Sequence, residues 1–502
     1  MSLAVVYTRA QLGIIAPLVR IEVHVTAGLP SFTIVGLPEK AVKESRERVR
    51  SALVYNQFNL AIGRVTVNLA PADLPKMGAH YDLAIAIGLL AAQGDLELKS
   101  LQTYEFFGEM GLTGDIQTVP HLLPMVASNQ THNRTIIIPN QNQDISQYLD
   151  KITLLSAGHI LDVIHHLQGN ATLDPVVNSK TSDTKKQETI DFSDVYQQRH
   201  AKRALEIAAA GGHSVLMQGA PGAGKSMLAE RFKTILPPLQ SKQALEVAMI
   251  HSISPTEQNT PQWTQRPFRS PHHTASHIAM VGGGTQVLPG EVSLAHHGIL
   301  FLDELPEFPR LVLESLREPM ESGTIHISRA SRRVTYPAQF QLIAAMNPCP
   351  CGYLFDPNRA CRCSPDRIIQ YQSRISGPLL DRIDLRVSLA RIQLEALVGK
   401  KKESETSQSI RHRVVHAQQN QYSRQQKLNV NLSAKECDIL LTQSNLNESN
   451  LVASMAQFKL TARSFYRIIK VARTIADLKN KCHLDQEDIQ ESLAYRNHCH
   501  QQ

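Results

Sequence analysis

Eight consecutive residues have the types and order needed to hold a phosphate group. They are Gly219, Ala220, Pro221, Gly222, Ala223, Gly224, Lys225 and Ser226, which match the pattern GxxxxGK[ST] at each fixed position. Glycines let backbone N–H groups converge on phosphate oxygens, Lys225 neutralises the outer phosphates, and the Ser226 hydroxyl can bind Mg²⁺. The pattern predicts a nucleotide site; a chance glycine-rich loop is the alternative.

Three further polar residues could complete such a site. Asp303 and Glu304 follow the apolar stretch 298–302, and Asn347 follows the apolar stretch 340–346. We expect Asp303 to hold Mg²⁺ through water, Glu304 to polarise the attacking water, and Asn347 to position water against the γ-phosphate. Solvated strand ends are the alternative interpretation.

Four of the seven cysteines form two Cys-x-Cys pairs separated by nine residues: Cys349, Cys351, Cys361 and Cys363. Four thiolates suit tetrahedral Zn²⁺, although one intervening residue is fewer than the usual two to four. Redox chemistry is disfavoured because no Cys-x-x-Cys occurs here, and unliganded thiols remain an alternative. We predict one structural Zn²⁺ that braces the loop between Asn347 and Arg382.

Short apolar stretches must position these groups. Residues 215–217, 298–302 and 340–346 are typical of buried parallel strands, and an apolar helical period follows Lys225. Ligands of open α/β sheets bind at the carboxyl ends of the strands, so these polar residues should meet at one sheet edge. The fold class predicted for this region is therefore α/β.

The amino-acid composition excludes few classes of function. The chain of 502 residues has 52 Lys and Arg against 45 Asp and Glu, an excess that permits nucleic-acid binding without requiring it. No run of about 18 apolar residues and no signal-peptide pattern occurs, so we expect a cytoplasmic protein without membrane partners. Polar residues 170–188 predict a linker, and polar residues 400–427 predict a connecting helix with loops.

Several longer motifs resemble the ComM/YifB family of magnesium-chelatase-like AAA+ ATPases, and the resemblance runs over nearly the full length. The motifs are GAPGAGKSMLAERF, RPFRSPHHTASHIAMVGGG, PGEVSLAHHGILFLDELPEF, NPCPCGY and SGPLLDRIDL. The resemblance identifies the phosphate loop as Walker A, Asp303-Glu304 as Walker B and Asn347 as sensor 1. It also implies an arginine finger at Arg382, which reaches a neighbouring subunit, and a sensor-2 arginine at Arg463.

The resemblance also implies a domain organisation. Residues 1–168 should form an α+β Lon-protease-like domain, residues 169–189 a linker, residues 190–395 the α/β AAA+ P-loop core, and residues 396–502 a helical lid. His80 stands where a Lon protease has its nucleophilic serine, and Leu123 stands where it has its catalytic lysine. A Ser-Lys dyad needs both groups, so we expect this domain to have lost peptidase activity.

The function implied by the resemblance is a hexameric DNA motor. Such a ring would hydrolyse ATP and act as a helicase or branch-migration translocase on single-stranded or branched DNA. It would serve homologous recombination during natural transformation, with a recombinase or other recombination proteins as expected partners. A chelatase-type motor and a chaperone-like remodelling ATPase are the alternatives. Chelatase motors lack the four-cysteine insert and the front domain, and no integrin-like metal-binding domain follows the lid.

One stretch before Asn347 predicts a DNA-binding hairpin. Residues 324–328 and 334–336 have the extended alternating pattern, and Arg329, Arg332 and Arg333 lie around the turn between them. Related ring helicases project a hairpin into the channel at this position, where guanidinium groups would contact phosphates. An exposed basic turn is the alternative. The histidine-rich motif at 272–277 predicts a loop of the pore or nucleotide neighbourhood, and no metal is assigned to it.

Overall fold

A computed structural model of the chain describes residues 2–60, 63–131, 134–149, 152–177, 190–254, 264–329, 332–354, 356, 359–391, 405–444 and 461–497. Internal contacts divide the chain into two compact units. The first comprises Met1–Asp183 and Ser241–Trp263, and the second comprises Thr184–Gln240 and Thr264–Gln502. None of the helices in the described ranges is both long and apolar enough to cross a membrane.

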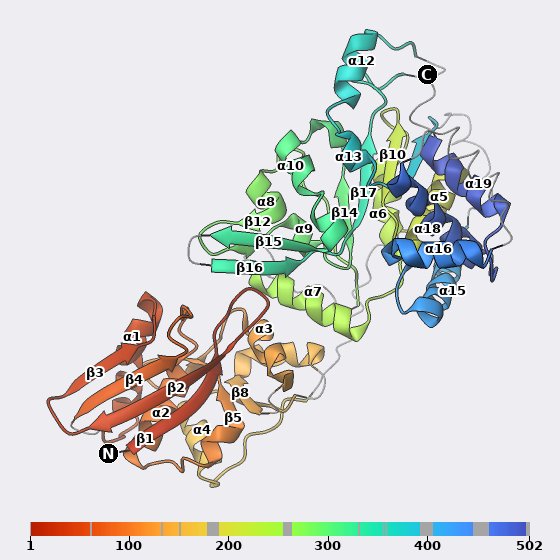
Figure 1. Ribbon diagram of the computed structural model, residues 1–502. Coiled ribbons are helices and arrows are strands. Elements are labelled where there is room, and N and C mark those ends of the chain that lie inside the picture. The colour runs from red at the N-terminus through yellow and green to blue at the C-terminus, as the bar shows by residue number, and fades with distance from the viewer. Residues whose placement is uncertain are drawn as a thin grey trace. The chain divides into compact units, whose positions relative to one another are not determined.

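The first unit is α+β and contains two main sheets (Figure 1). Its strands are β1 (Ser2–Arg9), β2 (Leu18–Thr26), β3 (Ser31–Val35), β4 (Arg64–Ala70), β5 (Tyr104–Phe106), β6 (Glu109–Met110), β7 (Ile116–Gln117), β8 (Thr135–Pro139) and β9 (Leu154–Ala157). Its α-helices are α1 (Lys40–Tyr55), α2 (Asp82–Gln93), α3 (Leu122–Ala127), α4 (Ile160–Leu167) and α7 (Ser241–Ile253). Three 3-10 helices, η1 (Ser100–Thr103), η2 (Ser128–Thr131) and η3 (Asn140–Tyr148), complete it.

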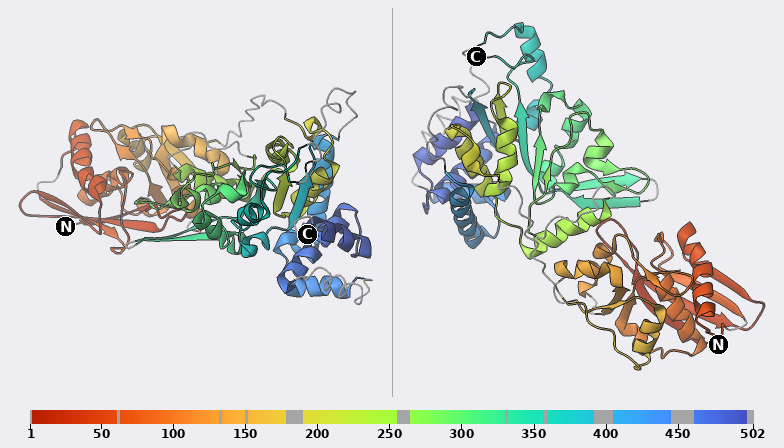
Figure 2. Two further views of the ribbon diagram at one scale, coloured as in Figure 1. Left: turned by 90° about the horizontal axis from the view of Figure 1, so that it is seen from above. Right: turned by 180° about the vertical axis from the view of Figure 1, so that it is seen from behind.

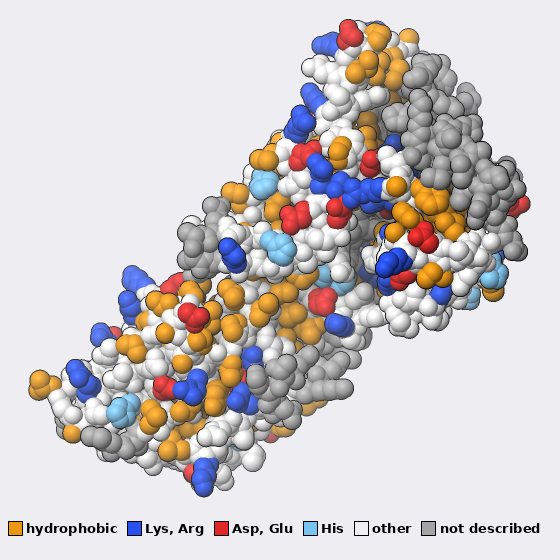
Figure 3. All heavy atoms as spheres, in the orientation of Figure 1, with side chains coloured by type: hydrophobic (Ala, Val, Ile, Leu, Met, Phe, Trp, Pro, Cys, Tyr) orange, Lys and Arg blue, Asp and Glu red, His pale blue; other side chains and the backbone are white. Residues whose placement is uncertain are grey.

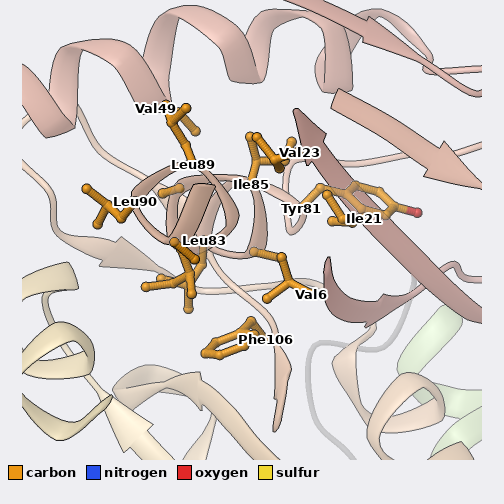
Figure 4. Packing of buried hydrophobic residues seen from close by; sticks show 14 of the residues in the cluster. Val6, Ile21, Val23, Val49, Tyr81, Leu83, Ile85, Leu89, Leu90 and Phe106 are labelled. Atoms are coloured by element: carbon orange, nitrogen blue, oxygen red, sulfur yellow. The ribbon is translucent and has the colours of Figure 1, made fainter. Parts of the chain in front are cut away.

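The larger sheet has the strand order β1-β2-β4-β3 and packs against helix α2. Alternate residues of β2 and β4 are buried, as expected of strands with one face on a core. Helix α2 reads DLAIAIGLLAAQ and is apolar nearly all round, which is typical of a helix covered on every side. Figure 4 shows its Leu83, Ile85 and Leu89 near Val6, Ile21 and Val23 of strands β1 and β2 and near Val49 of helix α1.

The smaller sheet, β5-β8-β9, is parallel and has helix α7 in its hydrophobic cluster. Ala248 of α7 is buried with residues of α3 such as Leu122 and Val126, and the His121 ring contacts the carbonyl oxygen of Ser252. Sequence analysis places residues 241–253 inside the 190–395 core, whereas the structure packs this helix with the first unit. The start of the predicted linker also packs here, because Val176 donates its N–H to Leu154.

The second unit is built on a five-stranded parallel sheet with the order β11-β14-β17-β10-β18. These strands are β10 (Val215–Gly219), β11 (Phe268–Arg269), β14 (Ile299–Leu302), β17 (Gln341–Met346) and β18 (Leu385–Leu389). Strand β14 is buried at every position, as the continuous apolar run predicts. Strand β17 lies between β14 and β10, so the segments that follow all three emerge at one edge of the sheet.

The shorter elements of the second unit surround this sheet (Figures 1 and 2). They are η4 (Phe192–Asp194), α5 (Arg199–Gly211), α6 (Lys225–Ile235), α8 (His277–Val281), β12 (Gly282–Gly283), β13 (Leu288–Pro289), α9 (Glu291–Leu294), η5 (Leu305–Glu307), α10 (Arg310–Ser315), α11 (Pro319–Ser322), α12 (Pro365–Gln372) and α13 (Gly377–Leu380). The C-terminal elements are α15 (Ser407–Gln425), η6 (Asn429–Asn431), α16 (Ala434–Thr442), α18 (Ala462–Leu478) and α19 (Gln486–Asn497).

The C-terminal helices have a hydrophobic cluster of their own. Ile469, Ala472 and Ala476 of α18 are buried with Leu484 and Ile489, the second of which lies on α19. Helix α15, which the sequence analysis treats as a connecting helix, packs through Val414 and Ala417 onto the core of the sheet unit.

Strands β15 (Thr324–Arg329) and β16 (Arg332–Pro337) form an antiparallel hairpin directly before β17. Ile325 and Tyr336 are opposite each other and buried, whereas His326 and Arg333 are exposed. The hairpin points away from the five-stranded sheet in each view (Figures 1 and 2). Its sequence alternation therefore corresponds to one face packed on the unit and one face in solvent.

Candidate nucleotide-binding site

The predicted phosphate loop joins strand β10 to helix α6. Gly222 and Gly224 have φ values of 78° and 88°, which favour glycine because a Cβ atom is strained there. The loop ends at the N-terminus of α6, where unpaired N–H groups and the helix dipole attract anions. Burial lowers the pKa of Lys225 below its ordinary value, although Asp303 and Glu304 oppose that shift.

Polar groups from three strand ends converge on this loop. The Lys225 Nζ atom donates to the carbonyl oxygens of Gly219 at 2.7 Å and Ala220 at 3.1 Å, and to Asn347 Oδ1 at 3.0 Å. The Ser226 hydroxyl donates to Asp303 Oδ2 at 2.7 Å. The structure therefore brings together the predicted lysine, serine, aspartate and asparagine from segments far apart in sequence.

Ser226 and Asp303 provide a hydroxyl and a carboxylate oxygen side by side. Oxygen ligands of this kind are those that Mg²⁺ prefers, usually together with water and phosphate oxygens. The pair therefore fits the predicted metal, since both side chains could offer an oxygen atom to it.

Glu304 lies at the same edge of the sheet and has an unusual backbone conformation. Its φ and ψ are 52° and 46°, in the left-handed region, and its N–H donates to Asp303 Oδ1 at 2.9 Å. A non-glycine residue in this region is strained, and such residues gather at functional sites. The Glu304 carboxylate is exposed, and its Oε2 atom lies 3.4 Å from Nδ1 of His273.

The four clustered cysteines follow Asn347 and lie in one place. Their Sγ atoms are all within 4.8 Å of one another, and three of the separations are 3.4, 3.6 and 3.6 Å. Tetrahedral zinc with Zn–S bonds of about 2.3 Å places sulfur atoms about 3.8 Å apart, so the thiol set fits Zn²⁺. The pKa shifts within the cluster are opposed. Backbone hydrogen bonds from Tyr353 and Arg362 lower the pKa of Cys351 to about 6, whereas burial and the neighbouring thiols raise the pKa of Cys361 to about 12 and also raise that of Cys363.

The cysteine segment packs directly on the phosphate loop. Gly352, one residue after Cys351, has a φ of 82°, and a Cβ atom added there would lie 2.5 Å from Cδ of Pro221. The same atom would lie 3.8 Å from Cγ of Asn347. A side chain at position 352 would thus displace the phosphate loop.

The two predicted arginines meet at one carboxylate. Arg382 is buried, and its Nη2 atom lies 2.8 Å from Oε1 of Glu321. Arg463, at the start of α18, forms an ion pair with the same Glu321 oxygen. Lys and Arg side chains gather near α13 on the face shown in Figure 3. The structure thus places the predicted finger and the predicted sensor-2 arginine together.

Other predicted positions are placed as follows. Arg329 and Arg332 lie at the ends of β15 and β16, where their side chains are outside the described residues, and Arg333 is exposed. His80 is buried, its Nε2 atom lies 2.9 Å from the carbonyl oxygen of Arg9, and burial lowers its pKa to about 4. Leu123 is buried in α3. Neither position offers an exposed nucleophile.

Sequence reasoning missed three residues of this region. Glu321 lies in the short helix α11, whose sequence contains no recognisable motif. Nothing in its spacing along the chain predicts a contact with Arg382 and Arg463. The position of Gly352 could have been noticed, because a glycine next to paired cysteines often allows two backbone segments to approach closely. His273 belonged to a motif noted for its histidines, but its contact with Glu304 depends on strand order.

Comparison with known proteins identifies relatives over the whole chain. The family described as magnesium chelatase, subunit ChlI, matches residues 191–397, its C-terminal part matches residues 404–496, and a further ChlI family matches residues 21–142. Competence protein ComM of Haemophilus influenzae is 44% identical over 499 residues, covering 99% of this chain and 98% of that protein. The protein YifB of Salmonella typhimurium is 45% identical over 497 residues, covering 99% and 97%. An MCM-type protein of Methanocaldococcus jannaschii is 37% identical over 109 residues, covering 21% and 14%.

Proposed function

Because this chain belongs to the ComM/YifB family of magnesium-chelatase-like proteins, we propose that it is an ATP-driven ring motor that moves along DNA and migrates branches. The main support for ATP hydrolysis is a pair of hydrogen bonds at the sheet edge. One joins Lys225 to Asn347, and the other joins Ser226 to Asp303. The relative named a competence protein supports a role in natural transformation, through recombination of incoming DNA.

Each group at the sheet edge has a task in hydrolysis. Lys225 would bind the outer phosphates, and Ser226 with Asp303 would hold Mg²⁺, which would supply positive charge to neutralise the phosphates. Glu304 orients and polarises the attacking water, and Asn347 positions that water against the γ-phosphate. The Lys225–Asn347 hydrogen bond places side by side the two groups proposed to contact the γ-phosphate.

Assembly of several copies is proposed from the family resemblance, which implies an arginine finger at Arg382. Arg382 and Arg463 share one carboxylate of their own chain, so a shift of Glu321 releases two guanidinium groups together. We infer that this pair serves the nucleotide of a neighbouring copy in a hexameric ring.

The hairpin β15–β16 is the proposed DNA contact. It precedes β17, which ends at Asn347, so a nucleotide-driven shift of that strand moves the hairpin as well. Exposed Arg333, together with Arg329 and Arg332, would contact phosphates without reading bases.

The four-cysteine cluster is proposed to hold one structural Zn²⁺. Its support is the sulfur spacing, and its effect is to hold the segment that packs on Pro221. The first unit is proposed to keep a Lon-protease-like fold without peptidase activity, because buried His80 and buried Leu123 replace the dyad. We propose that the first unit contributes to assembly of the ring or to DNA binding.

A protein-remodelling or chelatase-type ATPase is the second candidate, favoured by the ChlI family match itself. The discriminating experiment measures steady-state ATP hydrolysis with single-stranded DNA, with forked DNA and with an unfolded protein. Branch migration of a labelled three-strand junction is measured in parallel, with Glu304→Gln as the inactive control. We expect stimulation by DNA and ATP-dependent migration. Stimulation by unfolded protein alone, with no migration, would select the second candidate.

A further inference from the structure

Two buried arginines of the second unit pack against the same short segment of chain. Arg386 belongs to β18 and Arg496 to the last turn of α19. The Arg386 Nη2 atom donates to the carbonyl oxygen of Leu380 at 3.0 Å, and the Arg496 Nη1 atom donates to that of Ile383 at 3.5 Å. Three further nitrogen atoms, Nε of Arg386 and both Nε and Nη2 of Arg496, are buried and have no hydrogen-bond acceptor among the described residues.

The carboxylates of this region are paired with other groups. Asp384 lies 2.5 Å from Arg467 and accepts the N–H of Ser214 at 3.1 Å. Glu321 pairs with Arg382. In the described part of the chain, neither of the two buried arginines of β18 and α19 forms an ion pair with a carboxylate.

The two guanidinium groups carry positive charge that the fold leaves partly unbalanced. Burial and the neighbouring charge of Arg386 lower the pKa of Arg496 to about 10, although Asp384 and Asp381 oppose that shift. Both arginines therefore stay charged at neutral pH, since a guanidinium does not lose its proton there. A buried donor without an acceptor destabilises a fold, so a missing acceptor is expected at such a place.

The position of Arg496 in its helix explains only part of this arrangement. A cation is favoured in the last turn of a helix, where the carbonyl end of the helix dipole lies. That effect accounts for one arginine. It does not account for Arg386 on the adjacent strand, or for the unpaired nitrogen atoms of both side chains.

The chemistry and the burial together define the missing acceptor. Guanidinium groups present planar sets of N–H donors that match the oxygen atoms of phosphate and related oxyanions. Arg386 is 5% exposed and Arg496 is 7% exposed, so a phosphate of DNA or a carboxylate on another protein would not reach them. A small free oxyanion would be able to accept hydrogen bonds from both side chains.

This place is separate from the candidate nucleotide site. Arg386 is paired with Leu216 in the sheet, whereas Leu389 is paired with Gly219, the first residue of the phosphate loop. The three residues from 386 to 389 span about 10 Å of strand. The two arginines therefore lie toward the opposite end of β18 from the phosphate loop of the same chain.

We propose that Arg386 and Arg496 form a binding site for a small oxyanion of the phosphate class, which links α19 to the segment that carries Arg382. The ion accepts the unpaired N–H groups and offsets the charge of the two side chains. The site itself does not depend on the proposed function. Its consequence does, because holding the carbonyl groups of Leu380 and Ile383 also holds the backbone of Arg382, the proposed arginine finger.

The first test is equilibrium dialysis of the full-length protein against radiolabelled inorganic phosphate. It uses Lys225→Ala as the background, because this change weakens phosphate binding at the nucleotide site. We expect about one phosphate per chain, displaced by sulfate but not by AMP or by chloride at equal ionic strength. Adding Arg386→Gln or Arg496→Gln should raise the Kd for phosphate by about tenfold or more, since one charged donor set is lost. Arg374→Gln, at an exposed arginine paired with Glu307, is the matched control and should keep the binding.

The second test detects binding through stability and includes a variant that keeps the charge. Phosphate should raise the Tm of the wild-type protein in a saturable way, by about 2–4 °C once the site is filled. A linear rise without saturation comes from exclusion of phosphate from the surface and should remain in all variants. Arg496→Lys keeps the charge but loses the planar donor set, so its saturable shift should be intermediate.

Three results would overturn the proposal. They are wild-type protein that binds no phosphate, phosphate binding that survives both Arg386→Gln and Arg496→Gln, and displacement of phosphate by AMP or equally by chloride. Loss of phosphate binding on replacement of Lys225 alone would place the ion in the nucleotide site and overturn it as well. An ATPase that DNA does not stimulate would refute the proposed function and leave these binding results unchanged.

Discussion

Asp303 and Glu304, the two acidic residues that follow β14, have different surroundings. We therefore propose a different role for each. Asp303 accepts a hydrogen bond from the Ser226 hydroxyl, which suits the Mg²⁺-binding role proposed for this pair. Glu304 turns away on a left-handed backbone and faces exposed space beside His273. Under the proposed function, the exposed Glu304 is therefore the better candidate to orient the attacking water.

Substitution of Lys225 and of Glu304 should therefore separate binding from hydrolysis. Lys225→Ala removes the phosphate charge and should abolish both ATP binding and turnover. Glu304→Gln should bind ATP with near wild-type affinity while kcat falls by about 100-fold or more. Equilibrium binding of a fluorescent ATP analogue and a phosphate-release assay give the two quantities, and turnover near wild type in Glu304→Gln would exclude its assignment.

The segment that contains the four cysteines packs against the phosphate loop. Gly352 leaves space for Pro221, and the thiol cluster fixes Gly352 through the adjacent Cys351. If the cluster binds the proposed Zn²⁺, loss of that ion should consequently weaken nucleotide binding through the contact between Gly352 and Pro221.

Removal of one zinc ligand tests this dependence. We expect Cys361→Ser to lower the zinc content from one per chain to well below one, and to raise the Kd for ATP by about tenfold through a loosened phosphate loop. Elemental analysis and ATP titration measure the two effects. The buried Cys437, remote in sequence, provides the control variant Cys437→Ser, which should keep its zinc. Zinc-free wild-type protein with normal ATP affinity would contradict the prediction.

A buried ion pair joins the sheet to the C-terminal helices. Asp384, directly before β18, lies 2.5 Å from Arg467 of α18 and accepts the N–H of Ser214. Burial alone would raise the pKa of Asp384, but Arg467 and His213 hold it well below its ordinary value. Removing one partner of a buried pair leaves an uncompensated charge, which is strongly destabilising.

Asp384→Asn should lower the free energy of unfolding by about 3 kcal/mol near neutral pH, measured by urea denaturation. The folded pKa lies below the unfolded value of 3.8, so the contribution is complete above that pH and is lost as pH falls through the folded pKa. The difference between wild type and variant should therefore shrink only in acid. Glu307→Gln, which breaks an exposed pair with Arg374, is the control and should cost less than about 1 kcal/mol.

The hairpin is an element whose role can be tested apart from hydrolysis. Replacing Arg332 and Arg333 together with Ala should leave DNA-free ATP hydrolysis near wild type, because β15–β16 lies outside the phosphate site. DNA affinity, its dependence on salt and branch migration should all fall, since two phosphate contacts per copy are lost. Unchanged branch migration would show that the hairpin is an ordinary basic turn.

At the scale of the whole molecule, the arginine pair predicts that copies must cooperate. Arg382→Ala alone should hydrolyse ATP poorly, and so should Lys225→Ala. Mixed in one ring, each variant supplies the group that the other lacks, so activity should recover partly at intermediate ratios. Because Arg463 binds the same Glu321 oxygen, Arg463→Ala should recover in the same way. Failure of Arg463→Ala to recover, beside recovery of Arg382→Ala, would place sensor 2 on its own subunit's nucleotide.

Features formed by residues that are close in sequence could be predicted from the sequence alone. The phosphate loop is contiguous, so its glycines and Lys225 could be identified from spacing alone, as could the apolar strands and the alternating hairpin. The four thiols are also close in sequence, which made their clustering predictable.

Tertiary structure decided the contacts between segments that no local pattern connects. Glu321 meets both Arg382 and Arg463, and Gly352 meets Pro221, only because particular loops pack together. His273 reaches Glu304 because β11 is placed beside β14. The sequence of helix α7 predicts that its apolar residues are buried but does not predict against which core. In the structure this helix packs with the first unit. Hydrophobic burial is non-directional, so sequence states that a face must be covered but not which partner covers it.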